Sequence, residues 1–251
     1  MLGIERRQNI LDLLSENKFL SVHKLASLLY ASESTIRRDL EALSRLGLIS
    51  RTFGGAALVE GMNAEIPLAV REDQYNGQKE AIAVMASKLI HPDDILIVDS
   101  SSTAFKLLPY IRQSNTVITN SPKVSMELAG NAHPRVYSTG GHLRENSLSY
   151  VGRSAKNAVE LFNCDMMFFS CVGISPESGM TDTSEEEAEL KVTMMKRSRV
   201  KVAMIDSSKF DLVTFIKICD FSAIDYLITD KEPSLEWQQA FKQNNVELMY
   251  P

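Results

Sequence analysis

Short apolar runs recur through the last two thirds of this 251-residue chain, and most of them end in hydroxyl, amide or glycine residues before a helical pattern begins. Two clear examples are residues 95–98, followed by an aspartate and four hydroxyl residues, and residues 116–119, followed by Asn120-Ser121-Pro122. Continuous apolar runs of this length are typical of strands buried on both faces of a parallel sheet. Their alternation with helices predicts an α/β fold with a doubly wound parallel sheet. Further runs of this kind are residues 135–137, 166–169, 202–205, 226–229 and 246–249.

The polar residues that follow these runs predict a ligand site. Ligands of parallel sheets bind at the carboxyl ends of the strands, and hydroxyls together with free N–H groups at a helix start attract anions such as phosphate. Helix capping alone is an alternative explanation of any single one of these turns. Because such turns recur along one edge of the sheet, we favour a ligand site. The residues that we expect to line it are Asp99, Ser100, Ser101, Ser102, Thr103, Thr119, Asn120, Ser121, Gly140 and Gly141.

The beginning of the chain carries three amphipathic helical patterns, at residues 4–16, 21–29 and 32–46. Only a few residues connect the second to the third, which is typical of a helix-turn-helix. A hairpin pattern with two glycines follows at residues 48–58 and is typical of the wing of a winged helix. We therefore predict a winged helix-turn-helix DNA-binding domain over residues 1–58.

The third of these helices has the composition of a DNA-recognition helix. Ser32 or Ser34 is its expected N-cap, and Gly47 is expected to end it. Hydroxyl and guanidinium groups near its N-terminal end bond phosphates and base edges in a major groove. The alternative is the solvated charged face of an ordinary surface helix, and Arg51 in the hairpin could likewise be a solvated arginine. The expected DNA-binding residues are Ser32, Ser34, Thr35, Arg37, Arg38, Arg51, Gly54 and Gly55.

The charge distribution supports this division of the chain. Residues 1–58 hold eight basic and six acidic residues, a local charge of +2, whereas the whole chain carries −5. A mildly basic N-terminal domain (the head) on an otherwise acidic chain is consistent with a head that contacts DNA phosphates. The three cysteines have no zinc-site spacing and the four histidines are scattered, so we expect free thiols, no metal and no cofactor. No run reaches the roughly 18 apolar residues of a membrane span, and we expect a cytoplasmic protein without a membrane partner.

The chain resembles the DeoR family of bacterial transcriptional regulators. The likeness rests on Arg6-Arg7-Gln8-Asn9-Ile10-Leu11, on Ser34-Thr35-Ile36-Arg37-Arg38-Asp39-Leu40 and on the glycines around Arg51, and it extends to about Asp230. The resemblance implies a repressor of sugar-metabolism genes that binds double-stranded operator DNA and is not an enzyme. It also implies a sensor domain similar to ribose-5-phosphate isomerase, which binds a phosphorylated sugar or related metabolite with the strand-end segments. We expect a homo-oligomer whose heads read two half-sites.

The same resemblance assigns two lysines to the effector site. Lys191 lies in a Glu187-Ala188-Glu189-Leu190-Lys191 motif, where a solvated Glu187–Lys191 pair is the alternative, and Lys209 follows Asp206-Ser207-Ser208. Ser101 stands where the family usually has glycine, and Val172 where it often has aspartate.

One alternative is an enzyme related to sugar-phosphate isomerases or acyl-CoA transferases, but Val172 removes a carboxylate that a sugar isomerase would need for proton transfer. The other alternative, which Ser101 and Val172 keep open, is a DNA-binding protein whose sensor does not respond. The expected boundaries are a linker over residues 59–78 and an effector-sensing α/β domain over residues 79–251.

Overall fold

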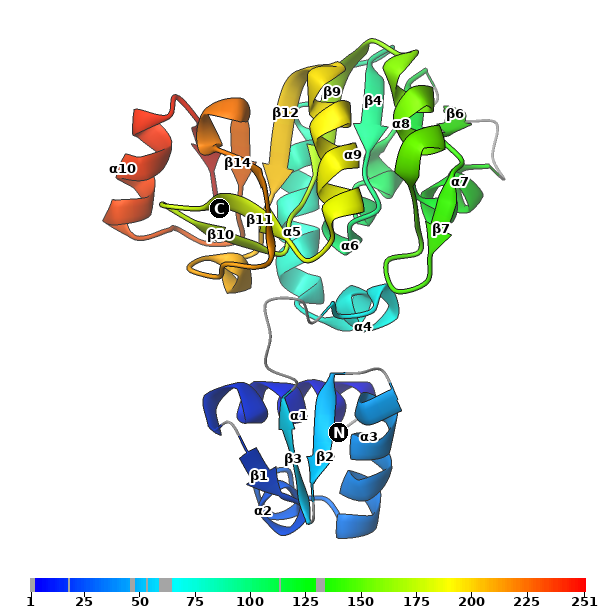
Figure 1. The fold of residues 1–251 in the computed structure, drawn as a ribbon. Helices are drawn as coiled ribbons and strands as arrows, with labels where there is room; N and C mark the ends of the chain where they lie inside the picture. Colours follow the sequence, from blue (N-terminus) through cyan, green and yellow to red (C-terminus); the bar gives the residue numbers. More distant parts are fainter. Residues whose placement is uncertain are drawn as a thin grey trace. The chain divides into compact units, whose positions relative to one another are not determined.

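The computed structural model describes residues 3–17, 19–45, 48–52, 54–58, 65–112, 114–129 and 134–251. The contacts between residues divide the chain into two compact units, Met1–Gln74 and Tyr75–Pro251. Figure 1 labels most of the helices and strands of both units.

The first unit is a winged helix, as predicted. Its three strands form an antiparallel sheet in the order β1-β3-β2. The three main helices pack their apolar faces together, and Leu14, Leu25, Ile36 and Leu40 in this core are 0% exposed. The elements are α1 (Gly3–Asn17), β1 (Phe19–Ser21), α2 (Val22–Leu28), α3 (Glu33–Arg45), β2 (Ile49–Thr52), β3 (Gly55–Leu58) and α4 (Leu68–Asp73).

The wing differs from the prediction in two respects. β1 was not predicted, because three residues carry too little pattern to mark a strand; it pairs with β3 through Leu20 opposite Ala56. The turn was expected at Gly54-Gly55, but Gly55 is already the first residue of β3, opposite Thr52. A side chain at Gly55 would come within 2.4 Å of the carbonyl oxygen of Leu20, so this glycine allows β1 and β3 to approach. Gly47, the expected end of α3, lies outside the described residues.

The second unit contains a seven-stranded parallel sheet in the order β15-β14-β12-β9-β4-β5-β6 (Figure 1). All seven strands were predicted; the central ones are apolar runs buried on both sides, whereas the edge strands β6 and β15 are more exposed. The strands are β4 (Ile95–Val98), β5 (Thr116–Thr119), β6 (Arg135–Ser138), β9 (Cys164–Phe169), β12 (Ser198–Met204), β14 (Tyr226–Ile228) and β15 (Glu247–Met249).

Helices cover both faces of this sheet, so it is doubly wound. Successive strand residues enter different cores: Ile97 packs in one with α8, α9 and α10, whereas Leu96 and Val98 pack in the other with α5, α6 and α7. This alternation is what the pleat of a strand requires. The helices are α5 (Asn76–Ser87), α6 (Ser102–Phe105), α7 (Pro122–Leu128), α8 (Gly152–Glu160), α9 (Glu185–Lys196) and α10 (Leu235–Gln243).

Two small antiparallel pieces were not predicted. One is the hairpin of β7 (His142–Arg144) and β8 (Ser149–Val151). The other is a three-stranded sheet, and its strands are β10 (Gly173–Ser175), β11 (Gly179–Asp182) and β13 (Ile216–Cys219). Each of these strands has only three or four residues, mostly polar or of mixed character. In a sequence such segments resemble loops.

Two further segments differ from expectation. The helix expected after the apolar run at residues 95–98 is a single turn, α6, followed by a separate 3-10 turn at Leu108–Tyr110. The described part of the expected linker, residues 65–78, contains α4 and the start of α5. No helix in the described ranges has the length and apolar character required to cross a bilayer.

Candidate functional site

The N-terminal end of α3 presents a linked group of hydroxyls. Ser32 is the N-cap, since its Oγ accepts a hydrogen bond from the backbone N–H of Thr35 at 3.2 Å. The same Oγ lies 2.9 Å from Ser34 Oγ and 2.8 Å from Thr35 Oγ1. Ser32 and Ser34 are exposed. The hydroxyls predicted to contact DNA therefore lie together at the end of the helix that a helix-turn-helix inserts in the major groove.

The two arginines of α3 differ in their partners. Arg37 donates to Glu33 at 3.0 Å, and His23 Nδ1 lies 3.3 Å from the other carboxylate oxygen of Glu33. The hydrogen bond from Arg37, followed by that from His23, lowers the pKa of Glu33. Arg38 is exposed and has no ion-pair partner among the residues that the structure describes. Arg38 is therefore available to bind a phosphate or a base edge. Arg37 must first leave its ion pair with Glu33.

A buried ion pair fixes the orientation of α3. Arg6 Nε of α1 donates to Asp39 Oδ2 at 2.6 Å, and both side chains are largely buried. This pair fixes α1 against α3 at the position next to Arg38.

The wing residues contribute in different ways. Arg51 is exposed on β2. Gly54 has a φ of +85°, which glycine adopts most easily, and its carbonyl accepts from the N–H of Val22 at 2.8 Å. Gly54 and Gly55 thus shape the wing, and direct contact of these residues with DNA stays a prediction.

In the second unit, Asp99 organises the turn that follows β4. Its Oδ1 accepts from the backbone N–H and the hydroxyl of Ser101, at 3.0 and 2.5 Å, and its Oδ2 accepts from the N–H of Ser170 at 3.2 Å. Burial raises the pKa of Asp99. Ser101 also caps α6, and its φ of −71° needs no glycine. Its hydroxyl is therefore bound to the turn, through Asp99 and the N–H of Ala104.

Two lysines reach this edge of the sheet. Lys209 Nζ donates to Ser170 Oγ at 2.8 Å and lies 3.5 Å from Asp206 Oδ2. Lys79, at the start of α5, donates to Ser102 Oγ at 3.0 Å and is only 3% exposed. Sequence reasoning missed Lys79 because a lysine in a helical pattern is ordinarily solvated, and no motif marks this one.

Lys191 lies in a buried ion pair that the sequence did not predict. Its Nζ lies 2.7 Å from Asp182 Oδ2, and both residues are buried. The alternative of a solvated pair with Glu187 is therefore wrong. Glu187 is itself buried and accepts from Ser149 and from Arg144. Lys191 also acts electrostatically on Asp99, so it belongs to the charge network around the strand ends.

Buried polar atoms without a hydrogen-bond partner gather at the same edge. Of six such side-chain atoms among the described residues, four follow strands β4, β5, β12 and β14. Buried polar atoms are rarely left unpaired, so each requires an explanation. The four are Thr103 Oγ1, Asn120 Oδ1, Asp206 Oδ2 and Thr229 Oγ1.

Other predicted residues of this edge have structural partners. Thr119 Oγ1 accepts from the N–H of Ser121, and Ser121 Oγ caps α7 by accepting from Val124. These contacts agree with the capping alternative. Gly140 and Gly141 both have positive φ and lead into β7. Ser100 and Ser102 are buried beside Asp99.

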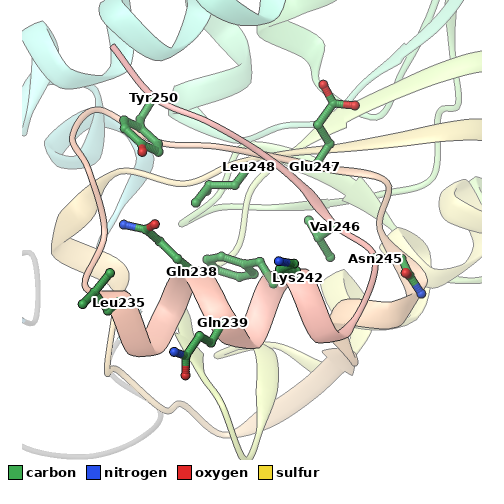
Figure 2. Close-up of a pocket in the computed structure, with 10 residues that line it drawn as sticks. Leu235, Gln238, Gln239, Lys242, Asn245, Val246, Glu247, Leu248 and Tyr250 are labelled. Atoms are coloured by element: carbon green, nitrogen blue, oxygen red, sulfur yellow. The ribbon is translucent and has the colours of Figure 1, made fainter.

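A cavity of about 680 Å³ lies elsewhere, between α10 and the edge strand β15 (Figure 2). Phe241, Lys242, Leu248 and Tyr250 are among the residues that line it. None of the residues predicted for the effector site lines this cavity.

Comparison with known families decides the class of this protein. A model described as the DeoR-like helix-turn-helix domain matches residues 6–61, and one described as the DeoR C terminal sensor domain matches residues 74–231. The chain belongs to the DeoR family of transcriptional regulators. The predicted family, the winged helix-turn-helix and the doubly wound sheet are thus confirmed.

Similar proteins of this family are named as regulators. The chain is 38% identical to the uncharacterized HTH-type transcriptional regulator YulB of Bacillus subtilis, over 92% of this chain and 90% of that protein. It is 30% identical to a putative aga operon transcriptional repressor of Escherichia coli O157:H7, over 98% and 93%. A protein of the DeoR family is a DNA-binding regulator and not an enzyme, so the isomerase alternative is set aside.

Among solved structures, ribose 5-phosphate isomerase A of Methanocaldococcus jannaschii matches 54% of each chain, with 14% identity and a TM-score of 0.40. This likeness is too slight to carry an argument about the effector.

Proposed function

We propose that this DeoR-family regulator is a repressor of carbohydrate-metabolism genes and that a phosphorylated sugar, bound at the carboxyl ends of the sheet strands, controls it. The observation that carries the proposal is the coincidence of unpartnered buried polar atoms with two lysines at this edge. A sensor of this family implies a small-molecule effector.

The lysines supply the chemistry for a phosphate. Lys79 and Lys209 reach the edge from α5 and from the turn after β12, and their ammonium groups bond to hydroxyls of Ser102 and Ser170. A phosphate can bind both ammonium groups and the Ser102 hydroxyl with charge-assisted hydrogen bonds, whereas the Ser170 hydroxyl already donates to the carbonyl oxygen of Met204. Burial of Lys79 strengthens such an interaction, because the interior screens charge less than water does.

The unpartnered oxygens supply the chemistry for a sugar. Asn120 Oδ1 has no hydrogen-bond donor among the described residues, and Asp206 Oδ2 has only its 3.5 Å ion pair with Lys209, so both favour a ligand with O–H groups. Thr103 and Thr229 offer hydroxyls that donate or accept. A ligand with one anionic end and several hydroxyls fits this set better than an apolar ligand or inorganic phosphate alone.

The repressor role and the carbohydrate context are proposed from relatives, one of which is named as a putative aga operon repressor. We propose further that the protein acts in the cytoplasm as a homo-oligomer, since paired helix-turn-helix domains read two half-sites. The effector would alter DNA affinity by favouring one arrangement of the assembly, with a coupling free energy on the order of 1–3 kcal/mol.

A thermal-shift screen tests the effector. The panel contains sugar phosphates, the matching free sugars and inorganic phosphate, and a ligand that binds only the folded state raises the melting temperature. We expect a shift with one sugar phosphate that Lys79→Gln abolishes and Lys231→Gln, a change at an exposed lysine after β14, preserves.

Two results would contradict the proposal. Equal shifts with a free sugar would remove the role of the phosphate. A protein that binds DNA but responds to no sugar phosphate would support the alternative of a sensor that does not respond.

A further inference from the structure

Tyr30 lies in the turn between α2 and α3, and it is the most exposed of the large apolar side chains that the structure describes, at 97%. Its φ is +51°, in the left-handed region that glycine and asparagine adopt more easily than tyrosine. Neither packing nor backbone preference therefore accounts for a tyrosine at this position. A strained residue that stability does not require is a candidate for a functional role.

The turn holds Tyr30 in a fixed place. The N–H of Leu29 donates to Leu25 and the N–H of Ala31 donates to Ala26, each at 3.0 Å, so the backbone is bonded on both sides of the tyrosine. Leu29 is buried in the core of the unit. The phenol thus projects into solvent from an anchored turn.

The position of this turn next to the recognition helix places the phenol where it can meet a DNA phosphate. Tyr30 is two residues before Ser32, the N-cap of α3, and so stands at the end of α3 that carries the hydroxyls of Ser34 and Thr35. In a helix-turn-helix this end enters the major groove, between the two phosphate backbones. Tyrosine hydroxyls are among the groups that bond phosphate oxygens and fix the position of a protein on the duplex.

We propose that Tyr30 is a positioning residue for DNA, and that its hydroxyl donates a hydrogen bond to a phosphodiester oxygen beside the major groove that α3 enters. The contact carries no base information, so it acts on every sequence. The phenol is neutral, so the contact releases no counterion and adds nothing to the salt dependence of binding.

The test uses the full chain and a labelled duplex of about 30 base pairs of mixed sequence, so no operator is needed, with affinity measured between about 50 and 200 mM salt. Tyr30→Phe removes only the hydroxyl and is expected to weaken binding about tenfold at every salt concentration, because a hydrogen bond to a charged group is lost. Tyr30→Gly suits the left-handed backbone and has no side-chain donor, so it should retain or raise the melting temperature while losing the same affinity. Tyr137→Phe, at a 42% exposed tyrosine of β6 in the sensor unit, is the matched control and should bind as the wild type does.

Three outcomes would overturn the proposal. The first is wild-type affinity in Tyr30→Phe. The second is a loss in Tyr30→Phe that Tyr30→Gly does not share. The third is a changed slope of affinity against salt, which would indicate a lost ionic contact in place of a lost hydrogen bond.

Discussion

Lys191 Nζ and Asp182 Oδ2 lie 2.7 Å apart in the interior of the sensor domain, where the two residues are 8% and 4% exposed. The pair joins α9 to the end of β11, two elements that no other ion pair among the described residues connects. Removal of one partner from a buried pair leaves an uncompensated charge, whereas removal of both does not.

We therefore expect Lys191→Met to lower the free energy of unfolding by about 3–5 kcal/mol. The double variant Lys191→Met with Asp182→Leu should recover much of this loss. Urea unfolding of the wild type, both single variants and the double variant measures the coupling. Purely additive single effects would show that the two charges do not stabilise each other.

The same pair predicts a dependence of stability on pH. Burial alone would raise the pKa of Asp182, but the ammonium of Lys191 and its hydrogen bond hold that pKa below its ordinary value of 3.8. A carboxyl whose folded-state pKa is depressed contributes stability above its unfolded pKa and loses that contribution as the pH falls through the folded value. The wild type should therefore lose more stability than the double variant when the pH falls from 7 to about 3. Urea unfolding at the two pH values measures this, and equal losses would contradict it.

The exposed pair of Glu33 and Arg37 predicts an effect on DNA affinity and not on stability. Exposed ion pairs contribute little to stability, so Glu33→Gln should leave the melting temperature nearly unchanged. It removes a negative charge from the recognition helix and frees Arg37 for phosphate, so mixed-sequence DNA should bind several-fold more tightly at low salt. Fluorescence anisotropy measures the affinity, and Glu160→Gln on α8 is the control. Weaker binding would mean that Glu33 itself contacts DNA.

The cysteines predict slow thiol chemistry. Burial raises the pKa of Cys164 to about 11 and that of Cys171 and Cys219 to about 12. The thiolate is the reactive species, so at pH 8 we expect a thiol reagent to label the folded protein far more slowly than the urea-unfolded protein. Rapid labelling of any one thiol in the folded state would contradict the structure at that position.

The sequence predicted those parts of the molecule whose pattern is local. A strand such as Ile95–Val98 is apolar throughout because both its faces are buried, and the stripe of Ile36 and Leu40 follows from the helical period. The N-cap hydroxyls were also predictable, since capping depends on neighbouring residues.

What the sequence did not predict depends on partners that are distant in the chain. Lys79 contacts a residue 23 positions away, and Ser149 contacts Glu187 across 38 positions. A buried lysine and a solvated lysine have the same local pattern in a helix, so only the fold distinguishes them. Strands β7, β8 and β10 are held by pairing with their partner strands and have little hydrophobic pattern of their own.

The last prediction separates the two functions of the chain. Arg38 is exposed on α3 and lacks an ion-pair partner in the described ranges, so Arg38→Ala should weaken DNA binding about tenfold through loss of a phosphate or base contact. The response of its melting temperature to the effector should be unchanged. Ser102→Ala combined with Thr103→Ala removes a partner of Lys79 and one unpartnered hydroxyl, so it should abolish the effector response and leave DNA affinity without effector intact. Thermal shift and anisotropy on both variants measure the four quantities. Two variants that each lose both activities to the same degree would show that the DNA and effector sites are not separate.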